Sequence, residues 1–164
     1  MFKIGDIIAY RSAGVCRVED IREDSLTGER KTYYFLKPLA KRNATVYVPL
    51  DNAMLCGRMT PLLSEAEARA LLDKPTDAVA LPWVDNPKER QTTFSATVAG
   101  GNRAEIVAIV RALVRHKREV EKEGRKFFAS DERLLDTAIS AVAGEIAYVL
   151  HREEHEIVTR LYEE

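Results

Sequence analysis

The sequence predicts an α+β fold, in which a small antiparallel β-barrel is followed by a compact all-α bundle. Residues 2–56 consist of short alternating stretches separated by turn residues, a pattern that is typical of β-strands. From residue 61 onward the apolar residues recur with the 3.6-residue period of helices. We therefore divide the chain into residues 1–60 and 61–164, with a connector at about residues 74–87.

Four or five strands are predicted in the first half. Gly5 lies in the first turn, and Gly14 precedes a strand that runs from Val15 to about Ile21. Gly28 lies in a turn between two further strands, of which the second is rich in Thr, Tyr and Phe. The stretch "ATVYVPL" is another strand, which Pro49 ends because it has no N–H to donate to a ladder. So many short strands in so short a segment predict a strongly bent barrel that works as a docking surface.

Four helices are predicted in the second half, each from a capping signal at its start and, for the first three, a breaking signal at its end. The first begins with the capping box "SEAE". The predicted starts are Ser64, Asn86, Asn102 and Ser130, and the first three ends are Asp73, Gly100-Gly101 and Gly124. Lys74-Pro75 follows the first helix, and residues after 150 extend the fourth. The apolar stripe of the fourth helix comprises Leu135, Ala138, Ile139, Val142, Ile146, Val149 and Leu150.

The charge of the chain is nearly balanced but unevenly distributed. The net charge of −1 argues against a generic binder of polyanions. Residues 88–126 nevertheless carry ten Lys and Arg against five Asp and Glu, whereas residues 127–164 carry three against nine. One segment can therefore meet phosphates although the whole chain is close to neutral.

The sequence contains no signal for export or for a membrane span. No run of 18 apolar residues occurs, and the N-terminus reads as a strand and not as a leader. Cys16 and Cys56 are predicted to be reduced and buried, which fits a reducing cytoplasm.

A basic stripe is predicted on the third helix. Arg111, Arg115, Arg118 and Lys122 are spaced by four, three and four residues, so they share one face opposite Leu113. The glutamates of this helix fall outside that face. The stripe is either a solvated face with i,i+4 salt bridges or a row of contacts for phosphates.

Two other features were weighed as sites. The sequence "HREEH" at residues 151–155 matches the inverted zincin pattern on a helix, but too few residues follow it to supply a further zinc ligand. No phosphate loop, nucleophile elbow or C-x-x-C motif occurs, so we predict that the chain is not an enzyme and needs no cofactor or metal.

Trp83, the single tryptophan, either packs the connector onto the bundle or contacts a partner such as an unpaired base.

The order of these parts resembles a known family. "FKIGDIIAYRSAGVCRVEDI", "TGERKTYYFLKP" and "TVYVPLDNA" resemble the N-terminal module of the CarD/CdnL family of bacterial transcription regulators. The same module is the polymerase-interacting domain of the transcription-repair coupling factor. "VAGGNRAEIVAIVRALVRHK" and "SDERLLDTAISAVAGEIAYVL" resemble the helical half of CarD/CdnL proteins. The resemblance extends over residues 1 to about 150.

The resemblance implies a Tudor/SH3-like barrel that docks on the β subunit of RNA polymerase and a helical domain at the upstream edge of the transcription bubble. It implies a cytoplasmic, nucleoid-associated protein that stabilises the open promoter complex without sequence preference, with no membrane and no small-molecule substrate. The expected polymerase-binding residues are Leu26, Thr45, Val46 and Tyr47. The expected DNA-binding residues are Trp83, Lys88, Arg90, Arg111, Arg115, Arg118 and Arg133.

The chain departs from the family pattern at two places. Pro87 stands where the tryptophan that wedges into the minor groove usually lies, four residues after Trp83. Tyr47 stands where many relatives have a basic residue in the polymerase-facing strand. A competing hypothesis is therefore a protein–protein adaptor that docks on polymerase or another partner without contacting DNA.

Overall fold

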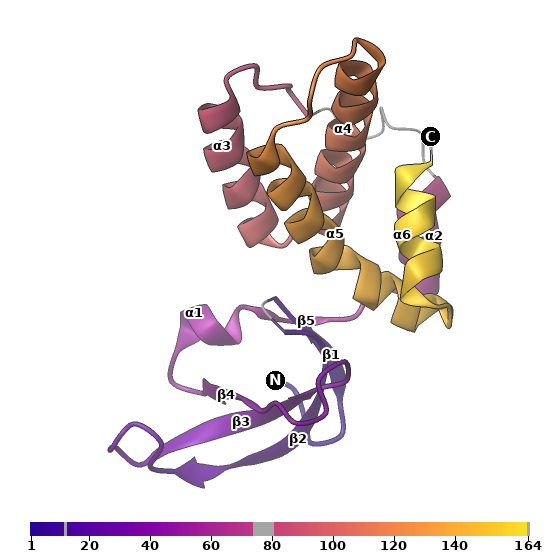
Figure 1. The fold of residues 1–164 in the computed structure, drawn as a ribbon. Coiled ribbons are helices and arrows are strands. Elements are labelled where there is room, and N and C mark those ends of the chain that lie inside the picture. The colour runs from indigo at the N-terminus through magenta and orange to yellow at the C-terminus, as the bar shows by residue number, and fades with distance from the viewer. Residues whose placement is uncertain (12, 74–80, 164) are drawn as a thin grey trace. The chain divides into compact units, whose positions relative to one another are not determined.

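The computed structural model describes residues 1–11, 13–73 and 81–163, and it confirms the α+β class. The chain divides into two compact units, Met1–Leu62 and Leu63–Glu164, which are drawn in Figure 1 and described separately below. Residues 74–80 of the predicted connector, including Lys74-Pro75, lie outside the described residues.

The first unit is built on a five-stranded antiparallel sheet. Its strands are β1 (Ile7–Tyr10), β2 (Gly14–Asp24), β3 (Lys31–Pro38), β4 (Val46–Pro49) and β5 (Met59–Pro61). Their order in the sheet is β4-β3-β2-β1-β5, so β4 and β5 form its two edges. No pairing joins these edges in the described part of the chain. The predicted closure into a barrel is therefore not confirmed.

One face of this sheet carries the core of the unit. Ile8, Cys16, Val18, Leu36 and Val48 are fully buried and belong to one cluster. The register of β2 against β3 shifts between Val18 and Asp20, and such a bulge bends a strand. The sequence pattern missed the short helix α1 (Ala53–Cys56), which begins where the Asn52 side chain accepts a hydrogen bond from the N–H of Leu55.

Within the described residues the second unit has five helices, one more than the pattern predicted. They are α2 (Glu65–Asp73), α3 (Pro87–Gly100), α4 (Arg103–Lys122), α5 (Ala129–Leu150) and α6 (Glu154–Tyr162). The capping box of α2 forms as predicted, since the side chain of Ser64 accepts from the N–H of Glu67 and that of Glu67 from the N–H of Ser64. α3 ends at Gly101, whose positive φ of 77° favours glycine.

The predicted start of the fourth helix is wrong. α5 begins at Ala129 with Phe128 as its N-cap, not at Ser130, and no side chain caps it. With this start Ser130 is the second and Asp131 the third residue of the helix, and a carboxylate in the first turn interacts favourably with the helix dipole. Beyond Leu150 the helix does not continue, because His151 takes a left-handed conformation (φ 54°) and α6 starts separately.

The helices pack around a single apolar core. Phe94 of α3, Leu113 of α4, Leu135 and Ile146 of α5 and Ile157 of α6 are all fully buried in it. The buried carboxylate of Glu145 accepts hydrogen bonds from the Arg103 side chain and from the N–H of Leu63, and this ties the first residue of the unit to α5. None of the described helices has the length and apolarity that a membrane span requires.

The environments of the two cysteines predict different reactivities. Burial raises the pKa of Cys16 to about 11, so its reactive thiolate is scarcer at pH 8 than that of an ordinary thiol. We expect iodoacetamide to alkylate Cys16 only in denaturant, whereas the half-buried Cys56 reacts more readily in the folded chain. Peptide mapping by mass spectrometry after timed alkylation measures both rates. Equal rates in the folded chain would contradict the buried position of Cys16.

Candidate functional site

Strand β4 is a free edge of the sheet. It pairs with β3, and no strand of the described chain pairs with its other side. The N–H of Leu50 donates to the carbonyl of Thr32 (2.9 Å), which fixes the hydrogen-bond alternation between the two strands. Val46 and Val48 accordingly direct their backbone groups toward β3. The N–H and carbonyl of Tyr47, between them, point away from the sheet.

The Tyr47 side chain is held in place by aromatic packing. It is 46% exposed, and its ring packs edge-on against Phe35, its cross-strand partner, with the centroids 5.1 Å apart. The guanidinium of Arg22 covers Phe35 at 4.0 Å from its centroid. Phe35 and Arg22 were missed as supports of this site. The sequence signal that could have indicated this support is the run Tyr33–Leu36, which is apolar on both faces of the strand and not only on one.

The structure brings together three of the four predicted polymerase-binding residues. Thr45 is exposed and directly precedes β4, Val46 is half-buried opposite Leu36, and Tyr47 follows. Leu26 is exposed but lies in the turn between β2 and β3. The candidate docking site is therefore the outer edge of β4 from Thr45 to Tyr47.

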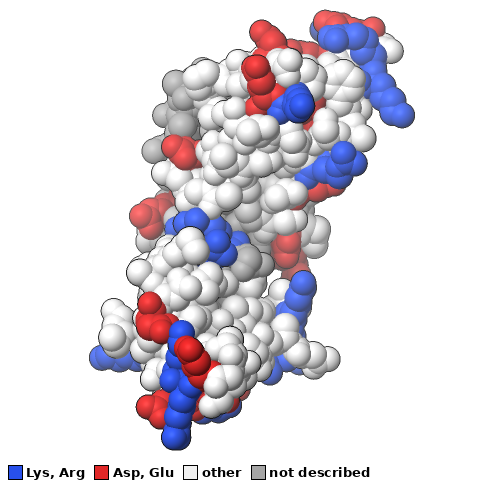
Figure 2. All heavy atoms as spheres, turned by 90° about the vertical axis from the view of Figure 1, so that its left-hand side faces the viewer, with Lys and Arg blue, Asp and Glu red and all other residues white. Residues whose placement is uncertain are grey.

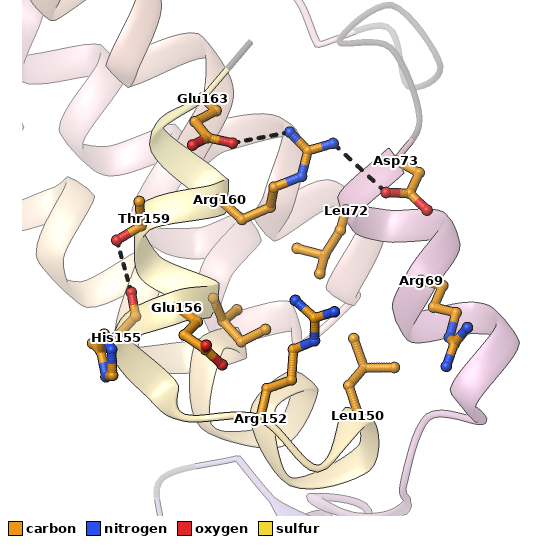
Figure 3. A pocket seen from close by; sticks show the side chains of 11 residues that line it. Arg69, Leu72, Asp73, Leu150, Arg152, His155, Glu156, Thr159, Arg160 and Glu163 are labelled. Atoms are coloured by element: carbon orange, nitrogen blue, oxygen red, sulfur yellow. Dashed lines mark hydrogen bonds and ion pairs between the residues drawn. The ribbon is translucent and has the colours of Figure 1, made fainter.

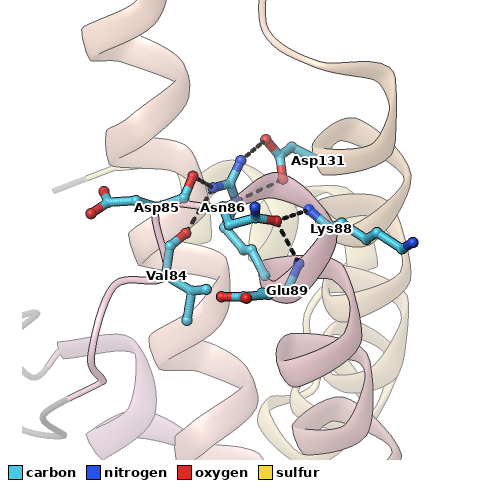
Figure 4. Close-up of polar contacts among 7 residues, drawn as sticks. Val84, Asp85, Asn86, Lys88, Glu89 and Asp131 are labelled. Atoms are coloured by element: carbon cyan, nitrogen blue, oxygen red, sulfur yellow. Dashed lines mark hydrogen bonds and ion pairs between the residues drawn. The ribbon is translucent and has the colours of Figure 1, made fainter.

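In the helical unit, Arg90 is the group that fastens the connector to the helices. Its guanidinium is enclosed, with 1% of the residue exposed, and it binds both carboxylate oxygens of the fully buried Asp131 at 2.9 and 2.6 Å. Nη1 donates to the carbonyls of Val84 and Asp85, as Figure 4 shows. The Asn86 side chain accepts from the N–H groups at the start of α3. Arg90 is therefore a buried structural group. The sequence predicted that it binds DNA, but its guanidinium is not available to a phosphate.

Trp83 packs on the helical unit. Its ring lies 4.5 Å from that of His116 and 6.0 Å from that of Phe94, measured between centroids, and the Arg90 guanidinium lies 4.7 Å from its centroid. Burial and the nearby Arg90 lower the pKa of His116, although Asp131 opposes this shift, so the cluster favours the neutral form of the imidazole. About a third of Trp83 (36%) stays exposed. The packing interpretation is therefore the one that the contacts favour, and a role in DNA binding stays a prediction.

Two arginines of the basic stripe bind the ends of other helices. Arg111 is half-buried and donates to the carbonyls of Leu71 and Leu72 in the last turn of α2, at 2.9 and 2.8 Å. Arg118 donates to the carbonyl of Tyr162 at the end of α6. The last carbonyls of a helix have no partner within it, so arginine is well suited to these positions. The stripe is thus partly structural, and the DNA contacts predicted for Arg111 and Arg118 compete with these bonds.

The other predicted DNA-binding residues lie on the surface. Lys88, Arg115 and Arg133 are exposed, and no ion pair of theirs is recorded within the described ranges. Figure 2 shows one face of the molecule, on which Lys and Arg lie among Asp and Glu and are separated by uncharged surface. This face has no continuous basic tract.

The zinc pattern does not lie on one helix. His151 ends α5 and His155 lies in the first turn of α6, so the i,i+4 geometry of the motif does not form. No cluster of three His, Cys, Asp or Glu side chains able to hold a metal ion occurs among the residues that the structure describes.

The β4 edge of this small antiparallel sheet has no strand on its outer side in the described chain, and an edge of this kind can accept a strand of another protein. Residues 2–62 match the family model of the CarD-like/TRCF RID domain, and residue 62 is also the last residue of the first structural unit. The chain therefore carries a CarD-like/TRCF RID domain, a family of RNA polymerase-interacting domains, and the predicted resemblance is confirmed for this segment.

The buried pair Arg90–Asp131 predicts a large effect on stability. Arg90→Met leaves the Asp131 carboxylate buried without its partner, so we expect a loss of about 3–5 kcal/mol in the free energy of unfolding. The double variant Arg90→Met/Asp131→Leu removes both charges and recovers much of that loss. Urea unfolding followed by Trp83 fluorescence measures it, with Arg133→Met as the matched surface control. A loss at Arg90 no larger than that of the control would contradict the assigned role.

Proposed function

We propose that this protein is a non-enzymatic regulator of transcription initiation that binds the β subunit of RNA polymerase and stabilises the open promoter complex. The observation that carries the proposal is the free outer edge of β4 within an RNA polymerase-interacting domain. The domain family supports the polymerase as partner. The β subunit, the DNA contact and the effect on the open complex are our inferences.

Docking through β4 is supported by the direction of its backbone groups. An added strand gains affinity from main-chain hydrogen bonds, and the N–H and carbonyl of Tyr47 are oriented to make them. The Tyr47 ring, held against Phe35, adds an aromatic contact beside these bonds. Aromatic anchors of this kind frequently dominate the energy of an interface. Tyr47 therefore supplies both the backbone and the side-chain contact.

The proposed DNA contact is limited to the side chains that the fold leaves available. Lys88, Arg115 and Arg133 would meet phosphates at the upstream edge of the bubble, and the exposed edge of Trp83 would meet the distorted step. Phosphate contacts position a protein on DNA without reading its sequence, so the preference for promoter sequence should be slight.

The adaptor hypothesis is supported by a specific observation. Arg90, Arg111 and Arg118, three of the seven predicted DNA-binding residues, are engaged within the helical unit, and Trp83 is packed. A protein that docks on polymerase without contacting DNA would show this pattern. The two hypotheses share the docking edge and differ only in what the helical unit does.

The docking edge predicts a selective effect of proline at position 47. Tyr47→Pro removes an N–H that points away from β3, so it leaves the internal ladder intact and deletes one intermolecular bond together with the aromatic ring. We expect polymerase β to be bound at least about ten-fold more weakly. Tyr47→Ala keeps the N–H and shows the contribution of the ring alone.

Binding of the full chain to polymerase, measured by biolayer interferometry, tests this expectation, and a thermal melt verifies folding. Met54→Ala, at an exposed apolar residue of α1 in the same domain, is the matched control and should bind as the parent chain does. Binding by Tyr47→Pro as tight as that of Met54→Ala would exclude the β4 edge.

The DNA contact predicts a longer lifetime of the open complex at a weak promoter. Arg115→Gln should shorten the lifetime toward that without the protein, and it should lower the salt dependence of binding to forked DNA because one phosphate contact is lost. A competitor-challenged lifetime assay at saturating protein measures the effect. An unchanged lifetime with intact polymerase binding would reject DNA stabilisation and support the adaptor hypothesis.

A further inference from the structure

A groove of about 530 Å³ lies in the helical unit, lined mainly by α2 and α6. Figure 3 shows α2 as one wall and α6 as the other, with Leu150 at the end of α5 between them. The only ion pair recorded from one wall to the other, within the described ranges, is that of Arg160 with Asp73 at 3.6 Å. The volume is in the range of small-molecule sites, roughly 300–1,000 Å³. Nothing in the proposed docking or DNA contact uses this groove.

Two arginines from different elements line the groove. Arg152 projects from the segment between α5 and α6 toward the middle of the groove, whereas Arg69 lies along the α2 wall (Figure 3). The ion pair of Arg69 with Glu65 is exposed and lies within one turn of α2, so it contributes little and can rearrange. For Arg152, no ion pair or side-chain hydrogen bond is recorded among the described residues. Arg152 is thus the cation of the groove that is available to a ligand, with Arg69 on the neighbouring wall.

The carboxylates of the groove are already engaged. Asp73 and Glu163 both bind Arg160, at 3.6 and 3.2 Å. The Glu156 carboxylate accepts from the N–H of Glu153 (3.2 Å) as part of the capping box that starts α6. Each of these acids therefore has a partner of its own, whereas Arg152 has none recorded among the described residues and is available to an anion from outside the chain.

The groove also has an apolar side. Leu72, Leu150 and Ile157 line it, and Ile157 is continuous with the core of the unit. Inorganic ions would leave this surface unused. We propose that the groove binds a small organic anion, whose carboxylate or phosphate group pairs with Arg152 beside the Arg69 wall and whose apolar part packs on Leu72 and Leu150. Planar guanidinium groups suit both kinds of anion because they can donate two parallel hydrogen bonds.

Phenyl phosphate is the probe that tests the proposal, with inorganic phosphate, phenol and benzoate as comparison ligands. Each is titrated into the ¹⁵N-labelled full chain at constant ionic strength, and amide chemical shifts are recorded. We expect saturable shifts in α2, α6 and the end of α5, with phosphate and phenol each binding at least about ten-fold more weakly than phenyl phosphate. Benzoate binding as tightly as phenyl phosphate would also support the site and identify carboxylates as ligands.

Arg152→Gln should weaken phenyl phosphate binding at least about ten-fold, because a charge-assisted contact is lost at a residue with no recorded side-chain partner in the described chain. Arg133→Gln, at an exposed arginine of α5 outside the groove, is the matched control and should leave binding unchanged. The proposal is overturned if both variants weaken binding equally, if the shifts lie elsewhere, or if no saturation occurs in the millimolar range. Because polymerase and DNA are absent, the result is independent of the proposed function.

Discussion

The helical unit depends on the burial of one charged side chain. Arg90 is enclosed by protein, and an arginine in such a place is tolerated only when its donors are satisfied. Asp131 neutralises the charge, and the carbonyls of Val84 and Asp85 take the remaining Nη1 bonds. These bonds join three parts of the unit: the first turn of α5, the first turn of α3, and residues 84–85, which directly follow Trp83. The position of the tryptophan is thus a consequence of the charge beneath it.

Hydrogen bonds from arginine to backbone carbonyls, like those of Arg90, also account for the absence of acids from the basic stripe of α4. Sequence reasoning took the exclusion of glutamate from that face as a sign of phosphate binding. In the structure, Arg111 and Arg118 instead bind the terminal carbonyls of α2 and α6, which are acceptors that carry no formal charge. A sequence does not reveal such backbone acceptors, because any residue type can supply them. Arg115, between the two, is exposed and illustrates that neighbouring positions on one face can have different roles.

Local signals predicted the parts of the fold that depend on local interactions. The capping box at Ser64, the caps at Asn86 and Asn102 and the glycine end of α3 act within a few residues, and all of them form. The start of α5 was mispredicted because its N-cap, Phe128, makes no side-chain capping bond, so no local signal marks the true start and the serine at position 130 was chosen instead. The break at His151 was missed because a non-glycine residue takes a left-handed conformation there. In the sheet, the alternation of apolar and polar residues predicted the strands. The support of Tyr47 by Phe35 and Arg22 could not be predicted in the same way, because it depends on which residues of neighbouring strands lie opposite each other.

The shortness of the free edge has a consequence for specificity. A long exposed strand edge invites pairing with any other edge, including that of a second copy. In β4 the outward positions are few: Pro49 has no N–H, and its carbonyl accepts from the N–H of Asn52 in the turn before α1. Tyr47 is then the one residue within β4 whose N–H and carbonyl can both meet an added strand. These few main-chain bonds cannot select a partner alone. The ring of Tyr47 and its surroundings must therefore decide which strand is accepted and in which register.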